Sequence, residues 1–142
     1  MRQRSKGIDA LGMRHCIAAG LMIAGLTSAQ AAEWQKPDSP FRMGEASPEI
    51  PATCETINKW INHAPDTQDR FSMDIVGEIA SIDWDGALAY LIMCKEPDAR
   101  VLCVTYSTND MKVGDKVLFS GGYQRAGEKQ VMLDPCLASK EE

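Results

Sequence analysis

The sequence predicts a mainly β protein, a small closed barrel of five strands preceded by one amphipathic helix. Three observations lead to this prediction: apolar residues at helical spacing over 51–64, two-residue alternation from Arg70 onward, and turn residues between the alternating segments. The chain has 142 residues, of which 44% are apolar and 25% charged. These values fit one small soluble domain and exclude a polytopic membrane protein or a low-complexity chain.

Residues 1–31 have the order of a secretory signal peptide. Four basic residues come before an apolar run over 16–26, and Ala29-Gln30-Ala31 supplies the small residues of a cleavage site. A transmembrane span needs roughly 20 apolar residues, and this run has about half that number. We therefore expect cleavage near Ala31, export to the periplasm or beyond, and no membrane span in the mature protein.

The mature chain, residues 32–142, is expected to be acidic. It contains 11 basic and 19 acidic residues, which gives a net charge of −8 with histidine neutral. Proteins that contact nucleic-acid phosphates normally present a basic groove. The charge balance therefore argues against nucleic acid as the partner.

The segment before the strands divides into two parts. Residues 32–50 contain prolines among polar residues without periodicity, which predicts an extended, partly disordered lead-in. Over 51–64, apolar residues from Ile50 to Ile61 recur at helical spacing with Trp60 beside them. This pattern predicts an amphipathic helix of about three turns.

Five segments with strand character follow within residues 70–136. They run over 70–84, 87–94, 101–106, 115–123 and 129–136. The apolar positions of the first segment change parity near Gly77, which predicts a bulge or a sharp bend. Asp85-Gly86 after that segment is a strong hairpin signal. Residues 137–142 form a polar tail that we expect to be frayed.

A long, bent first strand allows a five-stranded sheet to close, because its two halves can pair with different neighbours. This layout is that of an OB-fold. The connector over 107–114 has little room for the helix that usually follows the third strand, so we expect the helix over 51–64 to close the barrel end instead. A two-sheet sandwich is the alternative architecture.

Four short stretches of the expected barrel resemble a known family. They are Val-Gly-Glu-Ile-Ala-Ser-Ile over 76–82, Val-Leu-Cys over 101–103, Val-Gly-Asp-Lys-Val over 113–117 and Val-Met-Leu-Asp-Pro-Cys over 131–136. In this order they resemble small exported OB-fold proteins related to the tRNA_anti-like family, across residues 70–136. The resemblance implies a fold of nucleic-acid-binding ancestry and no particular activity for exported members. This chain departs from the pattern by its cysteine-bearing helix and by Tyr123 in place of a cysteine.

Four cysteines remain in the mature chain: Cys54, Cys94, Cys103 and Cys136. An even number in a small exported domain predicts two disulfides. The cysteines form no C-x-x-C pair, and His63 is the one histidine left after cleavage, which together argue against a metal site.

The sequence allows two main disulfide pairings. Strands three and five are neighbours in an OB barrel, so Cys103 can meet Cys136, and Cys54 on the helix then meets Cys94. Alternatively, Cys94 pairs with Cys103 across a short hairpin loop, which leaves Cys54 with Cys136. We favour Cys54–Cys94 with Cys103–Cys136, because the resembling family shares the cysteine positions in strands three and five.

The sequence pattern contains no catalytic constellation. Ser120-Gly121-Gly122 lacks the G-x-S-x-G nucleophile elbow, and one histidine leaves little for a Ser–His or Cys–His base. Asp83 and Asp85 are interpreted as hairpin residues, and the glycine pair is expected to relieve crowding at the barrel rim. The scattered methionines are assigned to core packing. We therefore predict that the protein is not an enzyme and uses no cofactor or metal.

Candidate ligand-binding residues come from the places where OB-folds bind, which are the face of strands two and three and the loops after strands one and four. Aromatic and basic residues occur there: Trp84, Tyr90, Tyr106, Tyr123 and Arg125. Such rings can stack on bases or sugars, and packing at the barrel ends explains them equally well.

We predict a non-enzymatic periplasmic binding or adaptor module that takes a protein or small ligand of the cell envelope through the loop end holding Trp84 and Tyr123. Two other classes stay open. One is a glycan-binding subunit resembling the OB-fold B-subunits of bacterial toxins, and the other is an envelope enzyme inhibitor or stress factor. A pentamer in solution would favour the toxin-like subunit, and a monomer would favour the module.

Overall fold

The computed structural model describes residues 31–44 and 46–142. The predicted signal peptide, apart from Ala31, lies outside the described residues, so its export and cleavage stay predictions. None of the helices in the described ranges is long and apolar enough to span a membrane.

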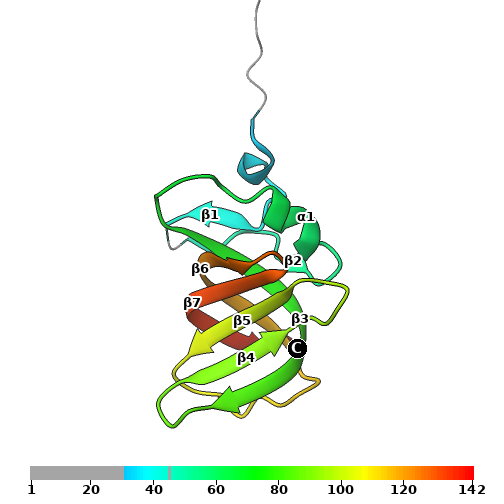
Figure 1. The fold of residues 1–142 in the computed structure, drawn as a ribbon, viewed down its shortest axis with the longest axis vertical. Helices are drawn as coiled ribbons and strands as arrows, with labels where there is room; N and C mark the ends of the chain where they lie inside the picture. Colours follow the sequence, from blue (N-terminus) through cyan, green and yellow to red (C-terminus); the bar gives the residue numbers. More distant parts are fainter. Residues whose placement is uncertain (1–30, 45) are drawn as a thin grey trace, which may run out of the picture.

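Five strands close into a barrel (Figure 1). They are β3 (Phe71–Trp84), β4 (Ala89–Met93), β5 (Arg100–Thr105), β6 (Lys116–Gly127) and β7 (Gln130–Lys140). The pairing follows the order β3-β4-β5-β7-β6 and returns from β6 to β3, with β5 and β7 parallel. This connectivity confirms the mainly β prediction and the OB-fold layout. The alternative of a two-sheet sandwich is wrong, because the pairing forms one closed sheet.

The length and bend of β3 make this closure possible. Residues 72–78 pair with β6, whereas 79–84 pair with β4. A register shift between Ile79 and Ser81 lies where the partner changes, which confirms the predicted bend. A Cβ on Gly77 would lie 2.9 Å from both Cys54 Sγ and Met93 Sδ. The bare backbone at Gly77 therefore leaves room for a disulfide above the strand.

The N-terminal segment is more ordered than the predicted lead-in over 32–50. Glu33–Gln35 form a 3-10 turn, β1 (Phe41–Met43) pairs antiparallel with β3, and β2 (Ala52–Thr53) pairs parallel with β3. Each of these strands has only two or three residues and therefore shows no period of its own in the sequence. Backbone pairing with β3 and burial of the Phe41 ring supply the order instead.

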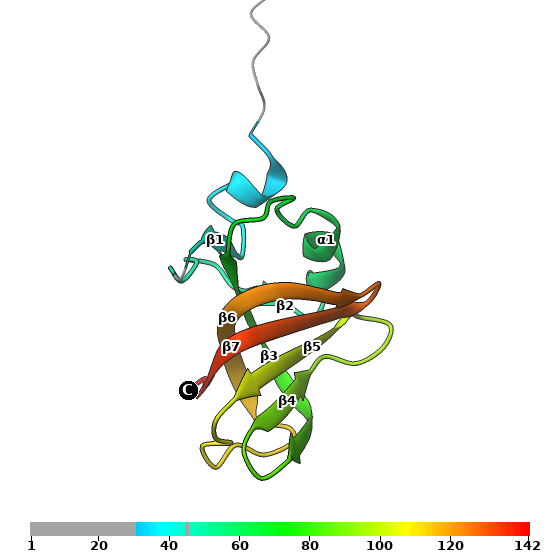
Figure 2. The same cartoon turned by 60° about the vertical axis from the view of Figure 1, so that its left-hand side comes forward.

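The helix is shorter than the predicted range 51–64. It is α1 (Ile57–Asn62), because β2 and a hydrogen-bonded turn occupy the residues before it. Its inner face buries Ile57, Trp60 and Ile61. Figure 2 shows α1 and β1 together above one end of the barrel, so the helix covers that end as the sequence predicted.

The last strand is longer than predicted. β7 continues past Cys136 to Lys140, and its final residues pair with the start of β6, from Leu137 opposite Ser120 to Lys140 opposite Val117. The prediction of a frayed tail over 137–142 is therefore wrong for most of that segment. The segment is polar, but its order comes from backbone hydrogen bonds, which composition does not report.

Two disulfides fasten the fold. Cys54–Cys94 joins the turn before α1 to the end of β4, and Cys103–Cys136 joins β5 to β7. Their Cα–Cα distances are 5.4 and 5.3 Å, within the usual range for disulfides. This connectivity is the first of the two pairings considered from the sequence.

Asp74 is a buried carboxyl on β3. Ser120 Oγ donates a hydrogen bond of 2.5 Å to Asp74 Oδ1, and the carboxylic residue is 4% exposed. Burial raises the pKa of Asp74, while the Ser120 hydrogen bond and the charge of Arg42 oppose that change. The native protein therefore holds a proton on Asp74 more tightly than the unfolded chain does.

Replacing Asp74 with asparagine should stabilise the protein at neutral pH. A raised folded-state pKa means that the charged carboxyl costs stability once the pH rises through that pKa, and the cost is absent below the unfolded value of about 3.9. An asparagine keeps an acceptor for Ser120 and carries no charge. Urea unfolding of both proteins from pH 4 to 8 should show a difference that grows with pH and then levels off. A variant that is less stable at neutral pH would contradict this assignment.

Candidate binding face

The structure separates the five residues predicted to bind a ligand. Trp84 and Tyr106 lie at the end of the barrel formed by the β3–β4 hairpin, Tyr90 lies on β4, and Tyr123 and Arg125 lie toward α1. The expectation that Trp84 and Tyr123 share one loop end is wrong. Because β3 and β6 are antiparallel, the turns that follow them must lie at opposite ends of the barrel.

Tyr123 is half-buried and packs against the core. Its ring lies 5.2 Å from the ring centroid of Phe41 and 5.1 Å from that of Phe71. Among the described residues its hydroxyl is buried without a hydrogen-bond partner, and burial raises the pKa of Tyr123. These aromatic contacts fill the barrel beneath α1.

Arg125 donates hydrogen bonds to three backbone carbonyls on two segments of the chain. Its Nη1 donates to Ile61 O at 3.2 Å, Nε to Gly127 O at 3.1 Å and Nη2 to Glu128 O at 3.0 Å. These bonds join the end of α1 to the β6–β7 turn, which lies beneath the helix in Figure 2. A guanidinium engaged in this way has a structural role that the sequence could not distinguish from ligand binding.

Replacing Arg125 with methionine should destabilise the protein by about 1–2 kcal/mol, because three charge-assisted hydrogen bonds are lost at a partly solvated site. Arg100→Met is a matched control, since the Arg100 side chain forms no hydrogen bond within the described ranges and should leave stability unchanged. Chemical denaturation of the oxidised proteins measures both effects. Equal stability of the two variants would argue against the structural role.

Tyr90 and Asp85 hold the hairpin between β3 and β4. Tyr90 Oη donates to Asp85 Oδ2 at 2.7 Å, and Asp85 Oδ1 accepts the backbone N–H groups of Ala87 and Leu88 at 2.8 Å. These bonds lower the pKa of Asp85. The hydrogen bond from its own hydroxyl to Asp85 and nearby carboxylates raise the pKa of Tyr90. Asp85 is thus a hairpin residue, as the sequence indicated.

A continuous apolar area crosses the outer face of three neighbouring strands. We call it the outer strip, and it consists of the half-buried side chains of Tyr90, Ile92, Leu102, Val104 and Met132. Strand register joins them, because Tyr90 lies opposite Val104, Ile92 opposite Leu102, and Leu102 opposite Met132. The sequence carried part of this signal, since β4 is apolar at consecutive positions, but only Tyr90 was selected.

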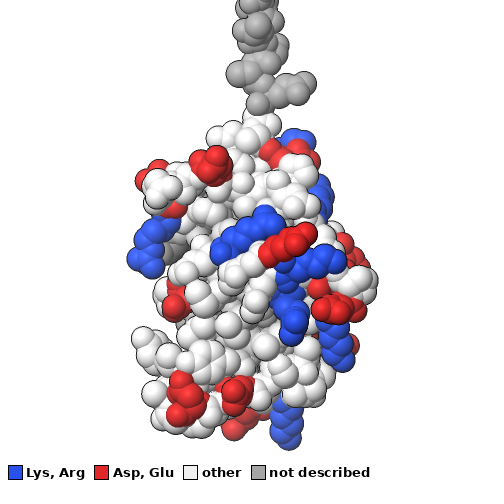
Figure 3. Space-filling view, viewed as in Figure 1, with Lys and Arg blue, Asp and Glu red and all other residues white. Residues whose placement is uncertain are grey.

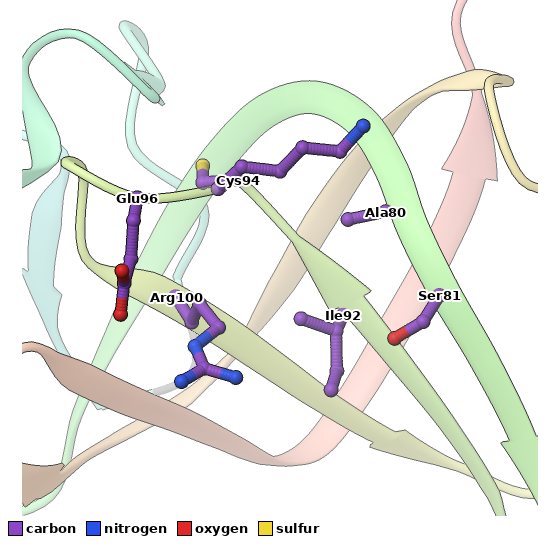
Figure 4. A pocket seen from close by; sticks show the side chains of 7 residues that line it. Ala80, Ser81, Ile92, Cys94, Glu96 and Arg100 are labelled. Atoms are coloured by element: carbon purple, nitrogen blue, oxygen red, sulfur yellow. The ribbon is translucent and has the colours of Figure 1, made fainter.

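The surroundings of the outer strip differ from the strip in polarity. Figure 3 shows a broad uncharged area over β4, β5 and β7, with acidic side chains below it. Next to Ile92 lies a shallow hollow of about 350 Å³, lined by Ser81, Cys94, Glu96 and Arg100 among others (Figure 4). The face therefore combines apolar contact area with charged groups at its edges, an arrangement also found at protein–protein interfaces.

Comparison with known proteins identifies no family for this chain. No family model matches the chain, so the resemblance to the tRNA_anti-like family is not confirmed, and no curated protein sequence matches it. One similar solved structure comes from the S. pombe Stn1-ten1 complex, with 18% identity and a TM-score of 0.37, covering 51% of this chain and 60% of that chain. This chain thus spans less than two thirds of that neighbour.

Strand pairing and covalent links define the class to which the chain belongs. It is an OB-fold protein with a helix over one barrel end and two disulfides. Disulfides are typical of proteins in oxidising compartments outside the cytoplasm.

Proposed function

We propose that the protein is a non-enzymatic binding module that is exported to the periplasm and docks a protein partner on the outer strip. The outer strip is the observation that carries this proposal. The opposite faces of the same strands fill the core, with Leu91, Cys103 and Leu133 fully buried. Apolar residues on the outer face therefore add nothing to the core, and their grouping across three strands is typical of an interaction surface.

The composition of the strip favours a protein over a nucleic acid or a sugar. Isoleucine, leucine, valine and methionine offer contact area but no hydrogen bonds to hydroxyl or phosphate groups, and methionine adapts to irregular partner surfaces. Charged side chains are depleted at the centre of protein interfaces, as they are in the strip. The net charge of −8 over residues 32–142 also disfavours binding to phosphate groups.

The non-enzymatic part of the proposal is supported by the place of the histidine. His63 lies at the end of α1, where its Nδ1 is 2.8 Å from Lys59 O, and not on the outer strip. Turnover of a substrate that stops on a single polar substitution would contradict this part.

A glycan-binding subunit is the second candidate. Its specific support is the Tyr90 ring, whose neighbourhood includes the carboxylates of Asp83 and Asp134. A ring for stacking beside acceptors for hydroxyl protons is a chemistry that suits sugars. A ring-shaped oligomer in solution that binds oligosaccharides would favour this candidate over the adaptor.

Site-specific photo-crosslinking in the cell envelope tests the proposed function. A benzophenone side chain at position 92, on the strip, should give protein adducts, and the same group in place of Leu137 serves as the control because Leu137 is 77% exposed and lies elsewhere on β7. Leu102→Glu should reduce the adducts at position 92 at least tenfold, because it places a charge in the middle of an apolar interface. Identical adducts at both positions, or adducts insensitive to L102E, would contradict the proposal. Circular dichroism of L102E checks that the variant is folded.

A further inference from the structure

The outer strip lies between two margins of opposite charge. At the hairpin margin Asp83 lies opposite Tyr90 in the β3–β4 register, and Asp134 follows Leu133 on β7. At the other margin Arg100 lies on β5, two residues before Leu102. Three successive rows of side chains therefore follow the strand direction, and we call them levels. The acidic level holds Asp83 and Asp134, the apolar level holds Ile92 and Leu102, and the basic level holds Arg100.

The charged groups of these margins are available to a partner. Within residues 31–44 and 46–142, the side chains of Arg100 and Asp134 form no hydrogen bond or ion pair, and Asp83 accepts one bond, from the N–H of Trp84 at 2.8 Å. All three residues are exposed. Figure 4 shows Arg100 and Ile92 beside the same hollow, with the carboxylate of Glu96 near its edge. Lys95 also lines that hollow, so two cations and one anion surround it.

The spacing of the levels fits an extended chain. Residues that share one face of a strand repeat at about 6.8 Å, so the three levels span about 13 Å along β4 and β5. In aligned packing of one sheet on another, strand directions stay within about 30° of each other, and the order of the levels along the strands fits a segment that lies in this direction. Alternate side chains of such a segment have the same repeat and can meet the three levels in turn.

We propose that the occupant of the outer strip is an extended segment of a protein partner with a basic, an apolar and an acidic residue at every second position. The basic residue lies between Asp83 and Asp134, the apolar residue packs on Ile92 and Leu102, and the acidic residue meets Arg100. A segment whose basic residue comes first in its sequence runs parallel to β4. A segment whose acidic residue comes first runs antiparallel to β4. This inference rests on the proposed function, since it names the chemistry of the partner at the same face.

Selection from a random heptapeptide display library tests the inference on the oxidised protein. The expected result is enrichment of peptides with basic–x–apolar–x–acidic order, read in either direction. For D83N/D134N the preference at the basic position alone should disappear, and for R100Q the preference at the acidic position alone. A synthetic selected peptide should bind about two- to fivefold more weakly for each charge removed, as expected for exposed ion pairs. Arg70→Gln and Asp66→Asn, which change charges away from the strip, should leave selection unchanged.

The outcomes separate the two proposals. Enrichment that L102E abolishes but that shows no charge order would overturn the inference and leave the proposed function standing. Failure to enrich any peptide, or enrichment unaffected by L102E, would overturn both. Binding of oligosaccharide probes in a glycan array, with no peptide selected, would replace the peptide segment with a sugar.

Discussion

Replacing Gly121 with alanine should open the barrel between β6 and β7. A Cβ on Gly121 would lie 2.3 Å from Pro135 O, 3.0 Å from Cys136 Cα and 3.2 Å from Leu133 Cβ. The two closest atoms belong to the backbone of β7 and cannot rotate away, so the strands must separate. We expect the free energy of unfolding to fall by at least about 3 kcal/mol, or the variant to fail to fold.

Gly127→Ala provides a matched control in the same strand. A Cβ on Gly127 would lie 3.5 Å from Gln130 Cβ, an ordinary contact, so stability should change by no more than about 0.5 kcal/mol. Urea unfolding of both oxidised variants measures the difference. If the two variants lose the same stability, the close approach of β7 to Gly121 is not the cause.

The crowding at Gly121 comes from a bulge in β7. Gly121 lies opposite Cys136, and Tyr123 lies opposite Leu133. Between these two pairs β6 advances by two residues and β7 by three, so Asp134 and Pro135 of β7 lie opposite the single residue Gly122 of β6. The sequence did indicate that the glycine pair relieves crowding. It placed that crowding at the barrel rim, because the bulge of the partner strand is invisible in the glycine segment itself.

Elements with a strong local signal were predicted well. Two-residue alternation and turn residues located all five barrel strands, and the parity change near Gly77 located the bend in β3. Elements whose order comes from a distant strand were missed or shortened. β1 and β2 are ordered by backbone pairing with β3, and the end of β7 is ordered by backbone pairing with β6.

The candidate site was less predictable for the same reason. The sequence shows the type of each residue, but the role of a side chain depends on partners that lie far away in the sequence. Arg125, for example, donates a hydrogen bond to the backbone of Ile61, 64 residues earlier. Tyr123 carries no sequence mark that distinguishes a core ring from an exposed one. The outer strip needed the register of β4, β5 and β7, because alternation along one strand does not show which residues of another strand lie beside it.

Removing both disulfides should leave the protein unfolded or barely folded at room temperature. Cys54–Cys94 spans 40 residues and Cys103–Cys136 spans 33. Constraint of the unfolded chain by loops of this length stabilises a domain by about 2–4 kcal/mol for each disulfide. The combined loss of about 4–8 kcal/mol is comparable to the whole stability of a small domain, which is about 5–15 kcal/mol. Full stability after reduction would contradict a barrel held by its disulfides.

Removing one disulfide at a time should weaken a different part of the protein in each case. In C54A/C94A, we expect hydrogen-exchange protection to fall in β2 and α1, because that disulfide fastens the turn before α1 to the end of β4. In C103A/C136A the loss should lie in β5 and β7, since their backbone pairing ends at Cys103 opposite Leu133 and the disulfide holds β7 beyond the bulge. Each double variant should lose about 2–4 kcal/mol in urea unfolding. Uniform loss of protection in both variants would mean that helix and barrel open as one unit, and that neither disulfide acts locally.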